Sequence, residues 1–219
     1  MNKSRLAKDL QLYVVTDRHL ARPRSLVEVC RAALETGVRT IQLREKGVPR
    51  EEAVRAAREL LALTRSFGAM LIINDDPLVC AEVQADGVHL GQEDVSAGVA
   101  RRLLGPEVVI GVSVREPWEI RAAEEEGADY VAANLVFTTK TKTDISRPLG
   151  LPGVALLKEV TALPLVAIGG IDASNAAEVI RAGADGVAVV SAVMSAPDPA
   201  AACRNLFAAV AEGLRARRL

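Results

Sequence analysis

The sequence is poor in several features, and each shortage excludes a class of protein. It has three cysteines and no CxxC pair, which argues against a disulfide framework or zinc site and favours buried thiols in a reducing compartment. Only 3% of its residues are aromatic, too few for a base-stacking surface. Its net charge is −1, with both signs spread along the chain, so no basic face for nucleic acid or an anionic membrane is expected.

Long hydrophobic runs are also absent. No apolar run approaches the roughly 20 residues of a membrane-spanning helix. Met1–Asp9 lacks the apolar segment of a signal peptide. We therefore expect a cytoplasmic protein that does not bind membranes, and the sequence leaves a homo-oligomer open.

What the sequence does contain is a regular alternation of short apolar runs and helical stretches. The runs are almost continuously apolar, as expected of parallel strands covered on both faces. Eight runs are present: Leu12–Val15, Thr40–Leu43, Met70–Ile73, Gly87–Leu90, Val109–Val112, Tyr130–Ala132, Leu165–Ile168 and Gly186–Val189. Helical periodicity is clear over Glu51–Phe67, Pro117–Glu126, Asn175–Ala182 and Pro199–Arg217.

This rhythm predicts a single-domain (β/α)₈ TIM barrel over residues 1–219, with residues 1–10 as an N-terminal extension or short helix. A doubly wound open sheet is the alternative, but no strong GxGxxG motif follows the first run. The longest irregular stretch, Val136–Pro152, is expected to be functional because long loops in compact domains usually are.

A short Ala-Asp motif recurs before three of the apolar runs. Ala-Asp precedes a run at Asp86, Asp129 and Asp185, which suggests that these units pack in equivalent positions. Trp118, early in a helical stretch, is expected to be a packing residue.

Charged residues gather where the runs end, which is where active sites of such barrels lie. Arg44, Lys46 and Lys142 could neutralise phosphate oxygens. Asp75 and Asp94 could bind Mg²⁺, which prefers oxygen ligands and bridges to substrate phosphates. Cations beside two such carboxylates favour a pyrophosphate substrate.

A second phosphate site is predicted at the last two runs. Gly169-Gly170 and Val190-Ser191 follow them, and the corresponding loops of barrels often hold a phosphate. Glycine lets backbone N–H groups approach the oxygens, and a helix that starts at Ser191 would favour an anion. Two phosphorylated ligands, one of them a pyrophosphate, indicate group transfer with pyrophosphate leaving.

Structural roles compete for some of these residues. Asp75 and Asp94 could instead cap helices, and Asp76, which precedes Pro77, is better suited to a cap or turn than to a metal. His89 is expected to be a buried, hydrogen-bonded histidine, although proton transfer stays open.

The chain resembles the thiamine phosphate synthase family from Leu12 to Val193. The motifs that carry the resemblance are LYVVTDR at 12–18, QLREK at 42–46, IND at 73–75, DGVHLGQED at 86–94, GVS at 111–113, TKTK at 139–142, VAIGGI at 166–171 and GVAVVSAV at 186–193.

The resemblance implies a Mg²⁺-dependent transferase with one ion per subunit. It would join an aminopyrimidine methyl pyrophosphate to a thiazole phosphate, or its carboxylate, by dissociative loss of pyrophosphate. The implied pyrimidine pyrophosphate contacts are Gln42, Arg44, Glu45, Lys46, Asn74, Ser113 and Lys142, of which Arg44, Lys46, Ser113 and Lys142 are the catalytic set. The implied thiazole phosphate contacts are Thr139, Lys140, Thr141, Gly170, Val190 and Ser191, and the implied metal ligands are Asp75 and Asp94.

One segment departs from the family pattern. Ala132–Phe137 reads AANLVF where the family usually has a glycine- and proline-containing segment, which bears on the geometry of the loop before Thr139. Two other functions stay open: a thiazole tautomerase of the same barrel family, and a regulator that binds phosphorylated ligands without turnover.

Overall fold

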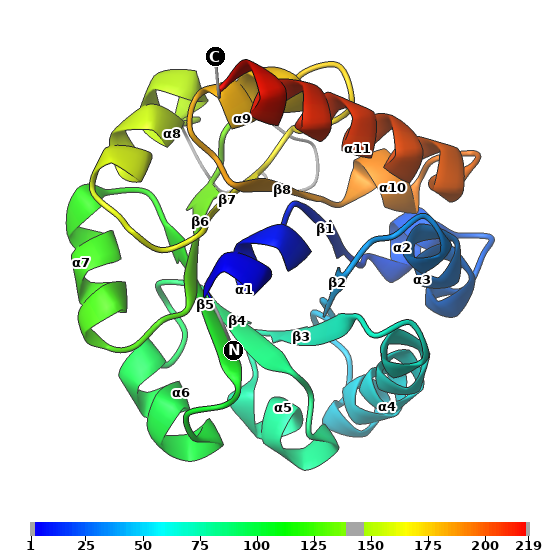
Figure 1. Cartoon of the computed structure of the whole chain (residues 1–219). Coiled ribbons are helices and arrows are strands. Elements are labelled where there is room, and N and C mark those ends of the chain that lie inside the picture. Colours follow the sequence, from blue (N-terminus) through cyan, green and yellow to red (C-terminus); the bar gives the residue numbers. More distant parts are fainter. Residues whose placement is uncertain (1–2, 139–146, 218–219) are drawn as a thin grey trace.

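The computed structural model describes residues 3–138 and 147–217 and confirms the predicted barrel. Eight parallel strands close into a ring in chain order, because β1 pairs with β8 as well as with β2 (Figure 1). The strands are β1 (Leu12–Val15), β2 (Thr40–Leu43), β3 (Met70–Asn74), β4 (Gly87–Leu90), β5 (Val109–Val114), β6 (Tyr130–Asn134), β7 (Leu165–Ile168) and β8 (Gly186–Val189).

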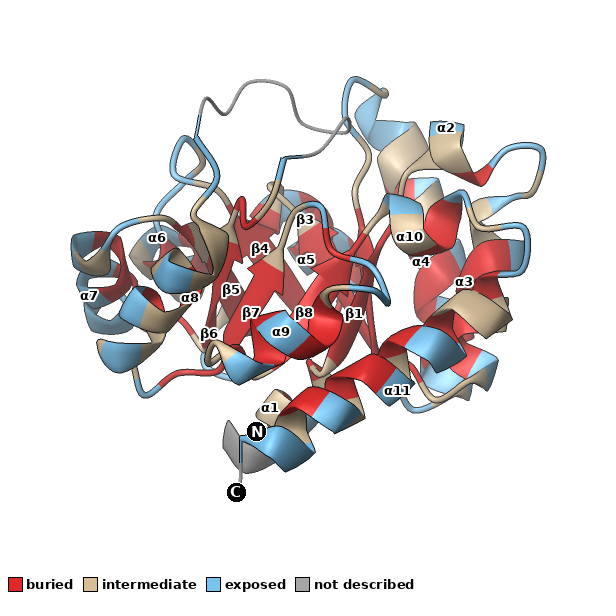
Figure 2. Cartoon of the chain, turned by 90° about the horizontal axis from the view of Figure 1, so that it is seen from above, coloured by how far each residue is buried: buried red, intermediate tan, exposed pale blue. Residues whose placement is uncertain are grey.

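Helices surround this ring and protect its outer face (Figure 1). Those of the predicted stretches are α4 (Arg50–Ser66), α7 (Pro117–Glu125), α9 (Ala176–Arg181) and α11 (Pro199–Ala216). The structure adds α2 (Arg18–Ala21), α3 (Leu26–Glu35), α5 (Pro77–Val83), α6 (Ala97–Leu104), α8 (Gly150–Glu159) and α10 (Ser191–Met194). A further helix, α1 (Lys3–Asp9), lies across the end of the barrel opposite to α2 and α10 (Figures 1 and 2).

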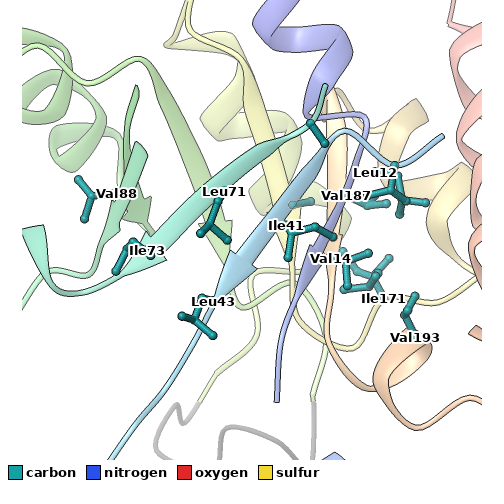
Figure 3. Close-up of a cluster of buried hydrophobic side chains, with 14 of the residues drawn as sticks. Leu12, Val14, Ile41, Leu43, Leu71, Ile73, Val88, Ile171, Val187 and Val193 are labelled. Atoms are coloured by element: carbon teal, nitrogen blue, oxygen red, sulfur yellow. The ribbon is translucent and has the colours of Figure 1, made fainter. Parts of the chain in front are cut away.

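Alternate residues of each strand point to opposite faces of the barrel wall. Leu12, Val14, Ile41 and Leu43 belong to the apolar layer between strands and helices, which Figure 3 shows in part. The strands are buried almost throughout, while exposed residues concentrate on the outer faces of the helices (Figure 2). Burial on both faces explains why the strand sequences are continuously apolar.

The barrel interior has its own, smaller core. Leu6 and Leu10, at and just beyond α1, pack with inward-facing strand residues in a second buried cluster. The strand members of this cluster are Tyr13, Val15, Met70, Ile72, Val109, Tyr130, Val166 and Ala188. Helix α1 therefore closes one end of the barrel with apolar side chains, which leaves the other end for polar chemistry.

Three strands run further than their apolar residues predict. Asn74 pairs in register with His89, Val114 with Ala133, and Asn134 with Ile168. The ladder continues past the apolar runs because each backbone group still finds a partner on the neighbouring strand. The added residues lie at the carboxyl ends of the strands, where Asn74, Ser113 and Asn134 carry polar side chains to the rim.

The three copies of the Ala-Asp motif have the same structural role. The carboxylates of Asp86, Asp129 and Asp185 accept hydrogen bonds from the backbone N–H of the preceding strand, at Leu71 (2.8 Å), Ile110 (2.8 Å) and Leu165 (2.9 Å) respectively. Each aspartate also donates its own backbone N–H to the carbonyl of that same strand residue. The prediction of equivalent positions is confirmed: each aspartate joins two neighbouring strands where the second begins.

The prediction for Trp118 is wrong. Its side chain is 65% exposed, because the second position of α7 faces outward from the barrel. Within residues 3–138 and 147–217, none of the helices has both the length and the apolar character needed to cross a membrane.

Gly111 provides a test of interior packing. A Cβ added there would lie 2.0 Å from Cζ of Tyr130, so it would overlap a rigid aromatic ring rather than a flexible chain end. We expect Gly111→Ala to lower the free energy of unfolding by roughly 1–3 kcal/mol, as overpacking does. The matched control is Gly98→Ala in α6, where the nearest atom to an added Cβ is 3.6 Å away. Denaturant unfolding that gave both variants equal stability would contradict this account.

The three cysteines provide a second test. Cys30, Cys80 and Cys203 are free and buried, as predicted, and burial raises the pKa of each thiol to about 12. In the unfolded chain a thiol ionises near pH 8.5, so only unfolding should expose reactive thiolate at pH 8. We expect no thiol to be alkylated rapidly in the native protein and all three in denaturant. Mass spectrometry after brief alkylation gives the count.

Candidate active site

A cavity of about 1030 Å³ opens at the carboxyl ends of the strands. This is the end opposite to α1, where the predicted polar residues arrive from successive strands. The predicted residues that line it are Gln42, Arg44, Lys46, Asn74, Asp75, Asp94, Ser113, Gly170, Val190 and Ser191. The structure thus brings together residues from six strands that are up to 149 positions apart in the chain, between Gln42 and Ser191.

The acidic part of the cavity is formed by Asp75 and Asp94. Asp75 follows β3 directly, and its backbone N–H donates to the carbonyl of His89 on β4 (2.8 Å). Asp94 lies in the loop after β4 and accepts a hydrogen bond from the backbone N–H of Gly91 (2.7 Å). Its pKa is raised chiefly by burial and further by Asp75, whose carboxyl group is within hydrogen-bonding reach. The two carboxyl groups are therefore neighbours.

Two neighbouring carboxylates are costly unless a cation offsets their charge. Lys46 supplies part of that charge: its Nζ lies 3.3 Å from Asp75 Oδ2, and it lowers the pKa of Asp94. The Lys46 side chain is 58% exposed, so solvent screens this pair and it contributes little to stability.

A divalent cation fits this donor set. Mg²⁺ commonly binds one or two carboxylates and fills its other positions with water and substrate phosphate oxygens. Among the residues that the structure describes, no group of three or more His, Cys, Asp and Glu side chains is arranged to hold a metal. Asp75 and Asp94 therefore suit a cation shared with a ligand better than one enclosed by protein.

Asp76 has a different role from its neighbour, as predicted. Its Oδ1 accepts hydrogen bonds from the backbone N–H groups of Leu78 and Val79, both at 2.9 Å, and so caps α5. Pro77 occupies the first position of that helix. Asp75, in contrast, has φ of 66°, a left-handed conformation that directs the chain from the strand into the cap.

Just after β2, the side chain of Glu45 points away from the cavity that Arg44 and Lys46 line. Arg44 and Lys46 line the cavity, whereas the Glu45 side chain is 3% exposed and its Oε2 lies 2.8 Å from Nε of Arg18. Glu45 is thus a partner for a nearby cation, Arg18, which also bonds Glu52 on α4, and its contact with a ligand stays a prediction. This pair joins the loops after β1 and β2 behind the cavity wall.

Arg44 is positioned through its backbone. Its N–H donates to Oγ1 of Thr16 at 3.0 Å, and Thr16 in turn donates its own N–H to the carbonyl of Gln42 at 2.9 Å. Thr16 is fully buried, so these bonds are shielded from water. The loop after β1 thereby fixes the direction in which the basic residues leave β2.

His89 is hydrogen-bonded within the barrel, as predicted. Its Nδ1 lies 2.9 Å from the Tyr130 hydroxyl and its Nε2 lies 3.0 Å from Oγ of Ser113. Only 8% of the residue is exposed. Its role in proton transfer stays a hypothesis.

The opposite wall of the cavity follows β7 and β8 and includes two glycines, Gly169 and Gly170. Gly170 has φ of 64°, and a Cβ there would lie 2.7 Å from the carbonyl oxygen of Thr138. Only glycine satisfies both the conformation and the space. Val190 and Ser191 follow β8 and line the cavity at the start of α10, which is a single turn and so has no long helix dipole.

Four predicted contacts lie outside the described residues: Thr139, Lys140, Thr141 and Lys142.

Sequence reasoning missed Arg115, which lines the cavity next to Ser113. Its guanidinium donates to the carbonyls of Asn134 (3.0 Å) and Arg147 (2.6 Å), at the two sides of the loop between β6 and α8. Its place two residues after Ser113, just beyond the end of β5, is the signal that could have identified it, because alternate residues of an extended chain share a face.

Comparisons with known proteins agree with this geometry. A thiamine-phosphate synthase of Roseiflexus sp. (strain RS-1) is 47% identical over 206 residues, covering 94% of this chain and 87% of that relative. One from Moorella thermoacetica is 48% identical over 195 residues, covering 89% and 93%. A solved structure of thiamine phosphate pyrophosphorylase from Pyrococcus furiosus has a TM-score of 0.87 at 42% identity and covers 95% of this chain and 99% of that one.

The family model agrees with these relatives. The model described as thiamine monophosphate synthase matches residues 12–193, which span every strand of the barrel and both sides of the cavity. The chain therefore belongs to the thiamine monophosphate synthase family, a family of transferase enzymes.

Proposed function

We propose that the protein joins an aminopyrimidine methyl pyrophosphate to a thiazole phosphate and releases thiamine phosphate and pyrophosphate. The observation that carries this proposal is the neighbouring pair Asp75 and Asp94, which shares one cavity with the cations of Arg44 and Lys46. Family membership and the names of the relatives support the same reaction.

The acidic and basic side of the cavity would receive the pyrophosphate. Mg²⁺ held by Asp75 and Asp94 would offset negative charge on the pyrophosphate as it leaves. Arg44 and Lys46 add positive charge from β2, and Ser113 can donate a hydrogen bond from β5. Gln42 and Asn74 offer amide groups to the pyrimidine part of the same substrate.

The glycine side of the cavity would receive the second ligand. Gly170, Val190 and Ser191 present backbone N–H groups to a thiazole phosphate. Thr139, Lys140, Thr141 and Lys142, which lie outside the described residues, stay predicted contacts of the same ligand.

The chemistry needs no protein nucleophile. The bond between the pyrimidine methylene carbon and the pyrophosphate oxygen breaks, and its electron pair leaves with pyrophosphate. The thiazole nitrogen then donates its lone pair to the methylene carbon and forms the new C–N bond. The protein holds the two reactants in line and stabilises the charge that develops on the leaving group.

The reaction itself provides the first test. We expect pyrophosphate to be released only when the pyrimidine pyrophosphate, the thiazole phosphate and Mg²⁺ are all present, in a ratio of one to the thiamine phosphate formed. A coupled phosphate assay and chromatography measure the two products. Tautomerisation of the thiazole without pyrophosphate release would identify a tautomerase, and ligand binding without turnover would identify a regulator; either result would overturn the proposal.

The adjacent aspartates allow a matched test of the metal assignment. Asp75→Asn and Asp76→Asn each remove one negative charge, and asparagine tolerates both the left-handed conformation at 75 and the cap at 76. We expect Asp75→Asn to lower Mg²⁺-dependent turnover by roughly a hundredfold or more, as loss of a group that stabilises developing charge does. Asp76→Asn should retain turnover.

The readouts are pyrophosphate release as a function of Mg²⁺ concentration and thermal unfolding of both variants. Both should unfold near the wild-type temperature. An unchanged Mg²⁺ dependence in Asp75→Asn would remove this residue from the metal site.

A further inference from the structure

A continuous line of hydrogen bonds crosses the barrel interior at the base of the cavity, and four of its members line the cavity: Gln42, Tyr13, His89 and Ser113. Gln42 Nε2 donates to the Tyr13 hydroxyl at 2.6 Å, and this hydroxyl lies 3.0 Å from that of Tyr130. The Tyr130 hydroxyl lies 2.9 Å from Nδ1 of His89, and Nε2 of His89 lies 3.0 Å from Oγ of Ser113. The line therefore links β2, β1, β6, β4 and β5 in one polar chain.

The barrel is built to admit this line. In the strand register, His89 and Tyr130 flank Gly111, and the absence of a side chain there lets the Tyr130 ring cross β5 to reach the histidine. The two rings stack with centroids 5.6 Å apart, and the Tyr13 ring meets Tyr130 edge-on at 6.1 Å. All four interior members are buried: Gln42, Tyr13, Tyr130 and His89.

Burial limits how the protons can be arranged. Burial raises the pKa of both tyrosine hydroxyls, so each keeps its one proton and has one hydrogen bond to donate. Gln42 donates to Tyr13, so every hydroxyl proton is used within the line when Tyr13 donates to Tyr130 and Tyr130 donates to His89. In that arrangement Nδ1 of His89 is an acceptor, and the proton of the neutral ring lies on Nε2, facing Ser113.

We propose that Gln42, acting through Tyr13 and Tyr130, holds His89 as the Nε2–H tautomer, and that His89 thereby turns the Ser113 hydroxyl proton toward the substrate. Tyr13, Tyr130 and His89 are positioning residues in this scheme. Ser113 is the group that contacts the reactant.

The chemistry at the cavity end requires the same direction. This step rests on the proposed function: a departing pyrophosphate has only acceptor oxygens, so Ser113 must donate to it. A serine hydroxyl that donates its one proton to the anion has lone pairs left to accept from Nε2–H of His89. Both ends of the line therefore favour one arrangement, in which every buried donor is used.

Nitrogen NMR tests the tautomer without any turnover. The chain has two histidines, so ¹⁵N-histidine labelling of the His19→Gln protein leaves His89 as the sole signal. At neutral pH we expect Nε2 to carry the proton and Nδ1 to resonate as an unprotonated ring nitrogen. A proton on Nδ1, or on both nitrogens, would overturn the proposal.

A double-mutant cycle tests the consequence for the reaction. We expect Tyr130→Phe to lower kcat about tenfold with little change in either KM, the order of effect of one lost hydrogen bond. In the Ser113→Ala background the same change should have no further effect on kcat, because the hydroxyl that it positions is gone. Equal losses in both backgrounds would show a merely structural role and overturn the proposal. If Tyr130→Phe does not fold, Tyr13→Phe enters the same cycle.

The two tests separate this inference from the proposed function. Turnover with the wrong His89 tautomer would refute the inference alone. The expected tautomer in a protein that releases no pyrophosphate would refute the proposed reaction alone.

Discussion

Closure of the parallel strand ladder is the constraint on which the rest of the structure depends. With β1 bonded to both β2 and β8, every strand has two neighbours and every carboxyl end reaches the same rim. Each strand then sends alternate residues into a narrow interior, where the available space is shared by all eight. Helix α1 fills one end with Leu6 and Leu10, so the polar residues have one opening toward solvent.

Charge in that opening is divided between two walls. The β2–β4 side holds two cations, Arg44 and Lys46, and two carboxylates, Asp75 and Asp94, while the β7–β8 side includes two glycines, Gly169 and Gly170. A pair of adjacent carboxylates, one of them with a raised pKa, is an unfavourable arrangement for the free protein. Such a local cost is expected where binding of a cation and an anionic ligand is meant to offset it.

The core and the active site are not separate layers in this barrel. Tyr13 and Tyr130 belong to the interior hydrophobic cluster, yet their hydroxyls join Gln42 to His89 and so reach the cavity. At the amino ends of the strands, the aspartates before β4, β6 and β8 hydrogen-bond the start of each of these strands to the preceding strand. Packing and polar contacts therefore support each other along the whole barrel axis.

The sequence by itself determined the fold class, the eight strand cores and ten of the residues that line the cavity, because apolar runs and the polar residues after them are local patterns. It also distinguished Asp76, a cap before Pro77, from Asp75. Only the tertiary structure decided that Glu45 turns behind the wall to Arg18, that Arg115 enters the cavity, and that a tyrosine on β6 reaches a histidine on β4. These outcomes depend on which strands are neighbours and on the space above Gly111, and neither is encoded in any one segment of the chain.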